Sequence, residues 1–319
     1  MKFQFNTLVA TLFFCIPFLC GAQETDTTNN RIYSIKVDTL NRTYIVHLPK
    51  NYNREKAYPL VLVFHGGGSN AKQWMPYCGM NETADKNDFI VVYPNGTGKT
   101  IEGYGDIFGW NGGTHIPGGI NSSVAKVNDV GFINTLLDTL EKQYTIDTNR
   151  IYAAGMSMGA MMVFRLASEL SNRIAAIAPI SGPMATESCT PQRPVSIIYF
   201  HGTEDPAVPF NGGKGKIDQT GTVYYSVDYS LACWLKANGC IANVAVKQLK
   251  DKANDGTFVT RKTYHCKNNS EVVFYEIKGG GHTWPGRDFG PELKILGTST
   301  KNIYANDIIW DFFKKHPKK

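Results

Sequence analysis

The chain has 319 residues, of which 42% are hydrophobic and 19% are charged, a composition typical of a soluble globular enzyme. One domain accounts for this length. The net charge of +6 is a mild excess that includes a lysine-rich C-terminal tail. We find no basic patch interleaved with aromatic residues, so nucleic acid is not an expected partner.

The first residues predict a signal peptide. A lysine precedes the apolar stretch 8–19, and small residues follow it. We therefore expect a signal peptide over 1–22, a secreted or periplasmic protein, and one folded domain over 23–319. The apolar stretch is too short for a membrane span, and no other segment could form one. Cys20 leaves a lipid-anchored form open, but the residue before a lipid-modified cysteine is usually small, and Leu19 is bulky.

Hydrophobic periodicity predicts the elements that follow. Residues 32–48 alternate between polar and apolar side chains, which predicts an antiparallel opening hairpin. Short apolar runs predict strands at 58–64, 88–93, 150–155, 174–180, 195–200 and 271–277. The segments between them predict helices at about 70–86, 128–144, 158–170, 226–238 and 301–315. Strands that alternate with helices indicate a mostly parallel central sheet with helices on both faces.

A glycine run, Gly66 to Gly68, follows the strand at 58–64 and a histidine. Glycines let backbone N–H groups approach a developing oxyanion, so the N–H of Gly67 is a candidate donor to that oxyanion. His65 is expected to hold the loop by hydrogen bonds. A plain flexible turn is the alternative interpretation.

Two long loops are expected at the carboxyl ends of strands, where this architecture binds ligands. They comprise the glycine-rich residues 95–127 and residues 206–222. Loops of this length in a compact domain are usually functional. Trp110 lies in the first loop and is a candidate substrate-binding residue, although packing beneath the loop would also explain it.

Residues 155–159 read Gly-Met-Ser-Met-Gly between a short apolar strand and a helix. This context is typical of the nucleophile elbow of α/β-hydrolases, a sharp turn that exposes the hydroxyl of Ser157 at the end of the sheet. The N–H of Met158 would then be the second oxyanion donor. An ordinary strand-to-helix turn with a serine N-cap is the alternative. The pattern predicts an α/β-hydrolase fold with Ser157 as the catalytic nucleophile.

A nucleophilic serine needs a base and an orienting carboxylate, and this fold places them after the serine in the order acid, histidine. His282 fits as the base, since its glycine-rich loop follows the last predicted strand. Asp205 follows the strand at 195–200 and precedes a proline, which favours it over Glu204 as the acid. A solvated loop histidine and a turn-forming Asp-Pro pair are the alternatives. Trp284 is expected to form an apolar wall of the substrate pocket, or else to pack beneath the loop.

The motifs occur in an order that resembles a known family. They are HGGG, GWN, NDVGFI, GMSMGAMM, RPVSIIYFHGTED, ANGC and GGGHTWPG. Over about residues 32–315 the chain is similar to the secreted esterase family that holds feruloyl esterases, acetyl xylan esterases and poly(3-hydroxybutyrate) depolymerases, with its LpqC-like bacterial relatives. Gly67 is a departure, because many relatives have a cysteine or another residue after His-Gly. A backbone donor survives this change.

The resemblance implies a disulfide between Cys240 and Cys266, which would staple the segment that carries His282. Of the 7 cysteines, 2 lie in the predicted signal peptide and 5 remain, so at least one thiol is unpaired or pairs between chains. A bridge between Cys189 and Cys233 is left open. The spacing is not that of a zinc site, and no metal or cofactor is expected.

Together these features predict an exported serine carboxylic-ester hydrolase. The expected substrate is an aromatic or acetyl ester linked to plant polysaccharide, with a feruloyl ester as the first choice. Acetyl xylan esterase and polyhydroxybutyrate oligomer depolymerase are alternatives in the same class, the latter weakened because no adsorption domain is recognised. A non-catalytic binding protein on the same scaffold is the alternative from another class, and it would lack a member of the triad.

Overall fold

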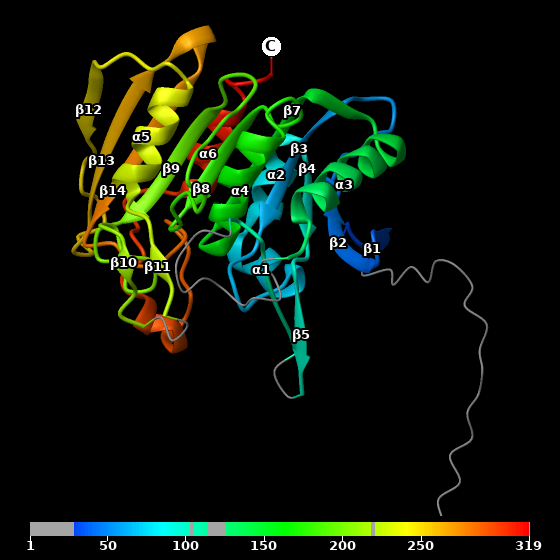
Figure 1. The fold of residues 1–319 in the computed structure, drawn as a ribbon, viewed down its shortest axis with the longest axis horizontal. Coiled ribbons are helices and arrows are strands. Elements are labelled where there is room, and N and C mark those ends of the chain that lie inside the picture. Colours follow the sequence, from blue (N-terminus) through cyan, green and yellow to red (C-terminus); the bar gives the residue numbers. More distant parts are fainter. Residues whose placement is uncertain (1–28, 103–104, 114–125, 218–220, 319) are drawn as a thin grey trace, which may run out of the picture.

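The computed structural model describes residues 29–102, 105–113, 126–217 and 221–318, so the predicted signal peptide lies outside the described residues. Its centre is a ten-stranded sheet with the strand order β1-β2-β4-β3-β7-β8-β9-β14-β13-β12 (Figure 1). The strands are β1 (Asn30–Val37), β2 (Leu40–His47), β3 (Tyr58–Phe64), β4 (Ile90–Pro94), β7 (Ile146–Met156), β8 (Ala176–Ile180), β9 (Ser196–Gly202), β12 (Val244–Gln248), β13 (Phe258–His265) and β14 (Glu271–Lys278).

The middle of this sheet, from β4 to β14 in the spatial order, is parallel. The flanking strands β1, β2, β13 and β12 pair antiparallel. Parallel strands covered on both faces need continuous apolar runs, and every residue of β3 and β8 is buried. The mostly parallel sheet that the sequence predicts is therefore confirmed.

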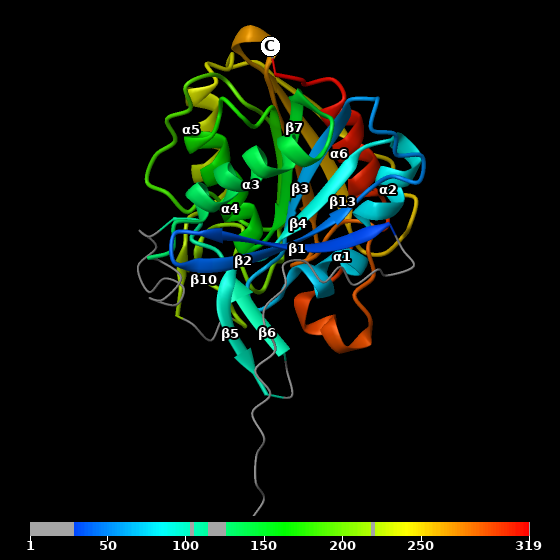
Figure 2. The same cartoon turned by 90° about the vertical axis from the view of Figure 1, so that its right-hand side faces the viewer.

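Helices cover both faces of the sheet (Figure 2). Those on one face are α3 (Asp129–Gln143), α4 (Met158–Glu169) and α5 (Val227–Ala237), and those on the other are α1 (Ala71–Cys78), α2 (Met80–Asn87) and α6 (Ala305–Phe313). Phe164 of α4 belongs to one buried cluster and Trp310 of α6 to another, so each face has its own hydrophobic core. None of the helices in the described segments is both long and apolar enough to cross a membrane.

The helix predicted over 70–86 is two helices in the structure. Gly79 lies between α1 and α2 and has a φ of 64°, in the left-handed region that ends a helix. The chain turns at this point, and α1 stays close to the loop after β3. The sequence shows this only as one glycine in an otherwise helical segment.

The sequence does not predict the short hairpins or the last sheet edge. The loop at 95–127 contains β5 (Thr97–Ile101) and β6 (Gly105–Gly109), and β10 (Gly213–Lys214) pairs with β11 (Val223–Tyr224) near the second long loop. The edge strand β12 is mostly exposed. Strands that are short or exposed lack the buried apolar run on which the prediction depends.

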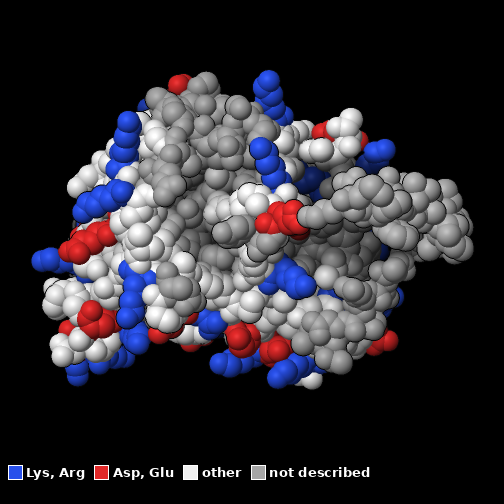
Figure 3. Space-filling model, turned by 90° about the horizontal axis from the view of Figure 1, so that it is seen from below, with Lys and Arg blue, Asp and Glu red and all other residues white. Residues whose placement is uncertain are grey.

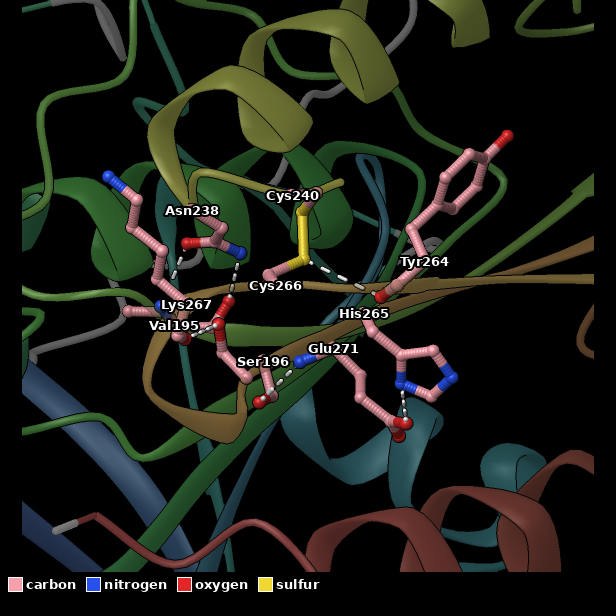
Figure 4. Close-up of a disulfide and its surroundings, with 10 residues drawn as sticks. Val195, Ser196, Asn238, Cys240, Tyr264, His265, Cys266, Lys267 and Glu271 are labelled. Atoms are coloured by element: carbon pink, nitrogen blue, oxygen red, sulfur yellow. Dashed lines mark hydrogen bonds and ion pairs between the residues drawn. A yellow bond between two sulfur atoms is a disulfide. The ribbon is translucent and has the colours of Figure 1, made fainter. Parts of the chain in front are cut away.

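A disulfide joins Cys240 and Cys266 (Figure 4), which confirms the pairing that the resemblance implies. Cys240 follows α5 and Cys266 follows β13, so the bond ties a helix on one face to the edge region of the sheet. Among the described residues the free thiols are Cys78, Cys189 and Cys233, and the bridge between the last two that the sequence leaves open is not formed.

Candidate active site

Ser157 lies at the turn between β7 and α4, at the carboxyl end of a central strand. Its backbone has φ 58° and ψ −121°, a combination that residues with a side chain rarely adopt. Its N–H donates to the carbonyl of Ile180 at 2.9 Å, which anchors the turn to the neighbouring strand β8. A strained, anchored strand-to-helix turn of this kind is the geometry of a nucleophile elbow.

The two glycines of the motif are required by close packing. A Cβ on Gly155 would lie 2.6 Å from the carbonyl oxygen of Gly159, and a Cβ on Gly159 would collide with the carbonyl oxygen of Phe64. Side-chain carbon atoms do not tolerate such contacts with backbone. Helix α4 therefore begins in direct contact with β3 and β7, and this contact fixes where Ser157 projects.

The structure brings Asp205 and His282 together. Asp205 follows β9 and is buried, and its Oδ2 accepts the Nδ1–H of His282 at 2.8 Å. Its Oδ1 accepts the backbone N–H groups of Ala207 and Val208 at 2.9 and 2.8 Å. Its neighbour Glu204 is exposed. The carboxylate next to the histidine is thus held from both oxygens.

A second histidine lies beside this carboxylate. Burial alone would raise the pKa of Asp205, but the charge and hydrogen bond of His282, together with the hydrogen bond from the Val208 N–H, hold it below its usual range. Burial lowers the pKa of His201, whose Nε2 donates to the Val208 carbonyl at 2.9 Å and whose Nδ1 accepts the Tyr199 hydroxyl at 3.0 Å. Asp205 is therefore ionised at neutral pH, beside a neutral His201.

Gly67 and Met158 lie side by side at the turn. Met158 is the first residue of α4, so its N–H has no carbonyl partner within the helix. A Cβ on Gly67 would lie 3.0 Å from Cε of Met158. His65 donates from Nδ1 to the Gly66 carbonyl at 2.8 Å and accepts the N–H of Gly96 at 3.1 Å. Because a peptide group is planar and trans, holding the Gly66 carbonyl fixes the direction of the Gly67 N–H.

A cavity of about 570 Å³ is lined by both Ser157 and His282. Trp74 and Tyr77 of α1 contribute to its wall, as does Tyr224 of β11. The other lining residues are Gly66, Gly67, Gly68, Ser69, Gln73, Met156, Ala207, Val208, Ile217, Leu293 and Leu296. These elements gather at the lower end of Figure 1, and the view from that side shows charged side chains of both signs interspersed over the described surface (Figure 3).

Trp284 and Trp110 do not line this cavity, contrary to the expectation from the sequence. Trp284 is fully buried, and its indole N–H donates to Oδ1 of Asn306 at 2.7 Å. Trp110 is 1% exposed, and its indole N–H donates to the carbonyl of His65 at 3.1 Å. Each indole N–H already has a buried partner, so both rings are part of the core.

Sequence reasoning missed the aromatic residues that do line the cavity. Trp74 and Tyr77 lie three positions apart on α1, which begins directly after the glycine loop. A helix that starts beside the expected oxyanion donors must present its first turns to the same site. The position of α1 directly after the glycine loop, together with the helical spacing of Trp74 and Tyr77, is the signal that could have identified these two residues.

A buried ion pair behind the glycine loop was also missed. Nη2 of Arg42 contacts Oδ1 of Asp129 at 2.7 Å, and Oδ2 of Asp129 accepts the N–H of Asn111 at 2.7 Å. The GWN and NDVGFI motifs are joined by this contact. In the described part of the chain, no cluster of three or more His, Cys, Asp or Glu could hold a metal ion.

A family model described as phospholipase/carboxylesterase matches residues 51–222, more than half of the chain. Together with the sheet order, this match confirms the predicted α/β-hydrolase fold.

The chain is similar to proteins named as feruloyl and acetyl xylan esterases. Feruloyl esterase D of Neurospora crassa is 27% identical over 303 residues, which cover 93% of this chain and 89% of that protein. Feruloyl esterase B of Piromyces equi is 28% identical over 76% of this chain, but this chain spans only 42% of that protein. The crystallised acetyl xylan esterase from Aspergillus awamori has a TM-score of 0.55 at 14% identity, covering 83% of this chain and 98% of that one, a likeness in fold alone. The resemblance that the motifs suggest is confirmed.

Proposed function

Because the chain belongs to the phospholipase/carboxylesterase family, we propose that it is a serine carboxylic-ester hydrolase with Ser157, His282 and Asp205 as its catalytic triad. One observation carries the proposal. The cavity that contains Ser157 also contains His282, whose Nδ1 is bonded to the buried Asp205 at 2.8 Å. That bond fixes the tautomer in which Nε2 is the basic nitrogen.

The proposed reaction uses these groups in two halves. Nε2 of His282 takes the hydroxyl proton of Ser157 as Oγ attacks the ester carbonyl, and Asp205 stabilises the imidazolium. The N–H groups of Gly67 and Met158 bind the oxyanion of the tetrahedral intermediate. The imidazolium then protonates the leaving alcohol. Water, activated by His282, cleaves the acyl-serine and regenerates the hydroxyl.

As the substrate we propose a feruloyl ester on plant polysaccharide. The similarity to a named feruloyl esterase extends over 93% of the chain, and the cavity has the aromatic side chains Trp74 and Tyr77 beside apolar Leu293 and Leu296. Such a wall suits a flat aromatic acyl group. Acetylated xylan and hydroxybutyrate oligomers are the alternatives within the class. Export is proposed on the N-terminal apolar segment and on the disulfide, a bond that persists in oxidising compartments.

The test is to assay the purified protein against methyl ferulate, acetylated xylan and hydroxybutyrate oligomers side by side, with Ser157→Ala as the control. We expect the highest kcat/KM for methyl ferulate. In Ser157→Ala we expect kcat to fall by about a million-fold on every substrate. A binding protein on this scaffold would leave even p-nitrophenyl acetate intact, and that result would overturn the proposal.

A further inference from the structure

Trp110 contacts both segments that carry the proposed oxyanion donors. Its indole N–H donates to the carbonyl of His65 at 3.1 Å, two residues before Gly67. Its backbone N–H donates to Sδ of Met158 at 2.9 Å. One buried residue is thus bonded to the glycine loop on one side and to the first residue of α4 on the other.

These two contacts act close to the donors themselves. The His65 carbonyl belongs to the peptide group just before Gly66, so holding it limits rotation of the loop towards the cavity. The Met158 side chain packs against Gly67, where a Cβ would lie 3.0 Å from Cε. When Sδ is held, this side chain is a fixed spacer between the loop and the helix. The distance between the two donor N–H groups therefore depends on where Trp110 lies.

Trp110 is itself held from behind. The next residue, Asn111, donates its backbone N–H to Asp129 at 2.7 Å, and Asp129 is paired with Arg42 at 2.7 Å. The indole packs edge-on against the ring of Phe64, with ring centroids 5.1 Å apart. Asp129 and Arg42 are buried at 0% and 3% exposure, so water does not compete for these bonds. The tryptophan is anchored to the core, and the glycine loop is anchored to the tryptophan.

We propose that Trp110 is the positioning residue of the oxyanion hole, setting the spacing of the Gly67 and Met158 N–H groups through its two hydrogen bonds. This inference rests on the proposed ester hydrolysis. Trp110 does not line the cavity, so it acts on the reaction only through those neighbours.

The role has a kinetic signature. The donors bind charge that develops only in the transition state, whereas the cavity walls bind the substrate in its ground state. Displacing the donors should therefore lower kcat and leave KM nearly unchanged. A residue that merely filled space would instead lower stability, with kcat per folded molecule unaffected.

The decisive variant is Trp110→Phe, which keeps a buried ring and removes the indole N–H. Trp234→Phe is the matched control, because Trp234 is also 1% exposed and its indole N–H has no hydrogen-bond partner among the described residues. Both variants lose the same volume from the same face of the sheet. Only Trp110→Phe loses a bond to the glycine loop.

We expect Trp110→Phe to lower kcat for p-nitrophenyl acetate by roughly 10-fold and to leave KM unchanged. This fall in kcat is smaller than the fall expected when an oxyanion donor is removed. Affinity for a trifluoromethyl ketone should fall by a similar factor, because Oγ of Ser157 adds to its carbonyl, the hydroxyl proton passes to His282, and the ketone oxygen becomes an oxyanion. Trp234→Phe should match the wild type in both measurements.

Equal kcat values for the two variants, or an effect confined to KM, would overturn the inference. If Trp110→Phe fails to fold, Met158→Leu removes the sulfur acceptor while keeping the volume and the backbone N–H. The same fall in kcat at constant KM is then expected, and an unchanged kcat would overturn the inference. A wild-type protein that hydrolyses no ester would instead refute the proposed function, so the two failures are distinguishable.

Discussion

Two adjacent carboxylates follow β9, and their surroundings decide which one can act on His282. Asp205 is buried and bonded to the imidazole, whereas Glu204 is exposed. We expect Asp205→Asn to lower kcat by about four orders of magnitude, because an amide favours the wrong histidine tautomer. Glu204→Gln is the control and should leave kcat nearly unchanged. The two kcat values are measured in steady state with p-nitrophenyl acetate. A larger fall in kcat for Glu204→Gln than for Asp205→Asn would refute the assignment.

Trp74 lines the cavity that contains Ser157, where the sequence suggests Trp284, and we propose that its ring contacts the acyl group of the substrate. We expect Trp74→Leu to lower kcat/KM for methyl ferulate by roughly 10-fold to 100-fold, about 1–3 kcal/mol, because an aromatic contact with the acyl ring is lost. Hydrolysis of p-nitrophenyl acetate, with its small acyl group, should be spared.

The control for this prediction is Trp310→Leu. Trp74 and Trp310 are each 5% exposed, and neither indole N–H has a hydrogen-bond partner in the described segments. Trp310 lies on α6 and does not line the cavity, so its loss should reduce stability without changing the preference between the two esters. Equal losses on both esters in Trp74→Leu would mean that Trp74 only supports α1.

At the scale of elements, Asn306 of α6 connects the C-terminus of α1 to the loop after His282. Nδ2 of Asn306, on α6, donates to the carbonyls of Cys78 and Gly79 at 2.9 and 3.0 Å. Oδ1 of the same side chain accepts the indole N–H of Trp284 at 2.7 Å. One amide therefore links α6, the last turn of α1 and the histidine loop. This link explains why Trp284 points into the core.

We expect Asn306→Ala to lower the free energy of unfolding by about 2–3 kcal/mol, because it leaves the buried Trp284 N–H without its partner and removes one hydrogen bond from each of two carbonyls. Asn172→Ala is the control, since Asn172 is exposed and bonds only at the surface. Urea denaturation measures both variants. Equal stability of the two would show that the amide link does not hold these elements together.

How far the sequence predicts these elements depends on how each one is buried. The strands β3 and β9 are buried along their whole length, so they stand out as continuous apolar runs. The exposed strand β12 and the hairpin of β5 and β6 have no such run and are missed. Chain order alone suffices to propose Asp205 and His282. It cannot tell which way an indole points, because that depends on buried partners such as Asn306 that lie far along the chain.

At the scale of the whole molecule, folding removes several histidines from water. Burial lowers the pKa of His47, His65, His201 and His316. For His65 the pKa falls from 6.5 to about 4. This ring must be neutral in the folded state, because Nε2 accepts the Gly96 N–H while Nδ1 donates to Gly66. A proton on Nε2 would face another donor.

Unfolding exposes these rings, which then titrate near their ordinary pKa of about 6.5. Between about pH 4 and pH 6.5 the unfolded chain therefore binds more protons than the folded one, so stability rises with pH in this window and is lost as the pH falls through it. Asp205 also contributes stability that is lost as the pH falls, but only at lower pH, because its pKa in the folded protein lies below 3.8.

We expect the free energy of unfolding to fall steadily when the pH is lowered from about 6.5 to about 4.5, with His65 alone contributing about 3 kcal/mol over its full window. Urea denaturation of the wild type and of His65→Gln at stepped pH measures the slope. The glutamine variant cannot take up the proton, so its slope should be shallower whatever its stability at neutral pH. Identical slopes in the two proteins would mean that the acid sensitivity comes from other groups, and that folding does not shift the pKa of His65.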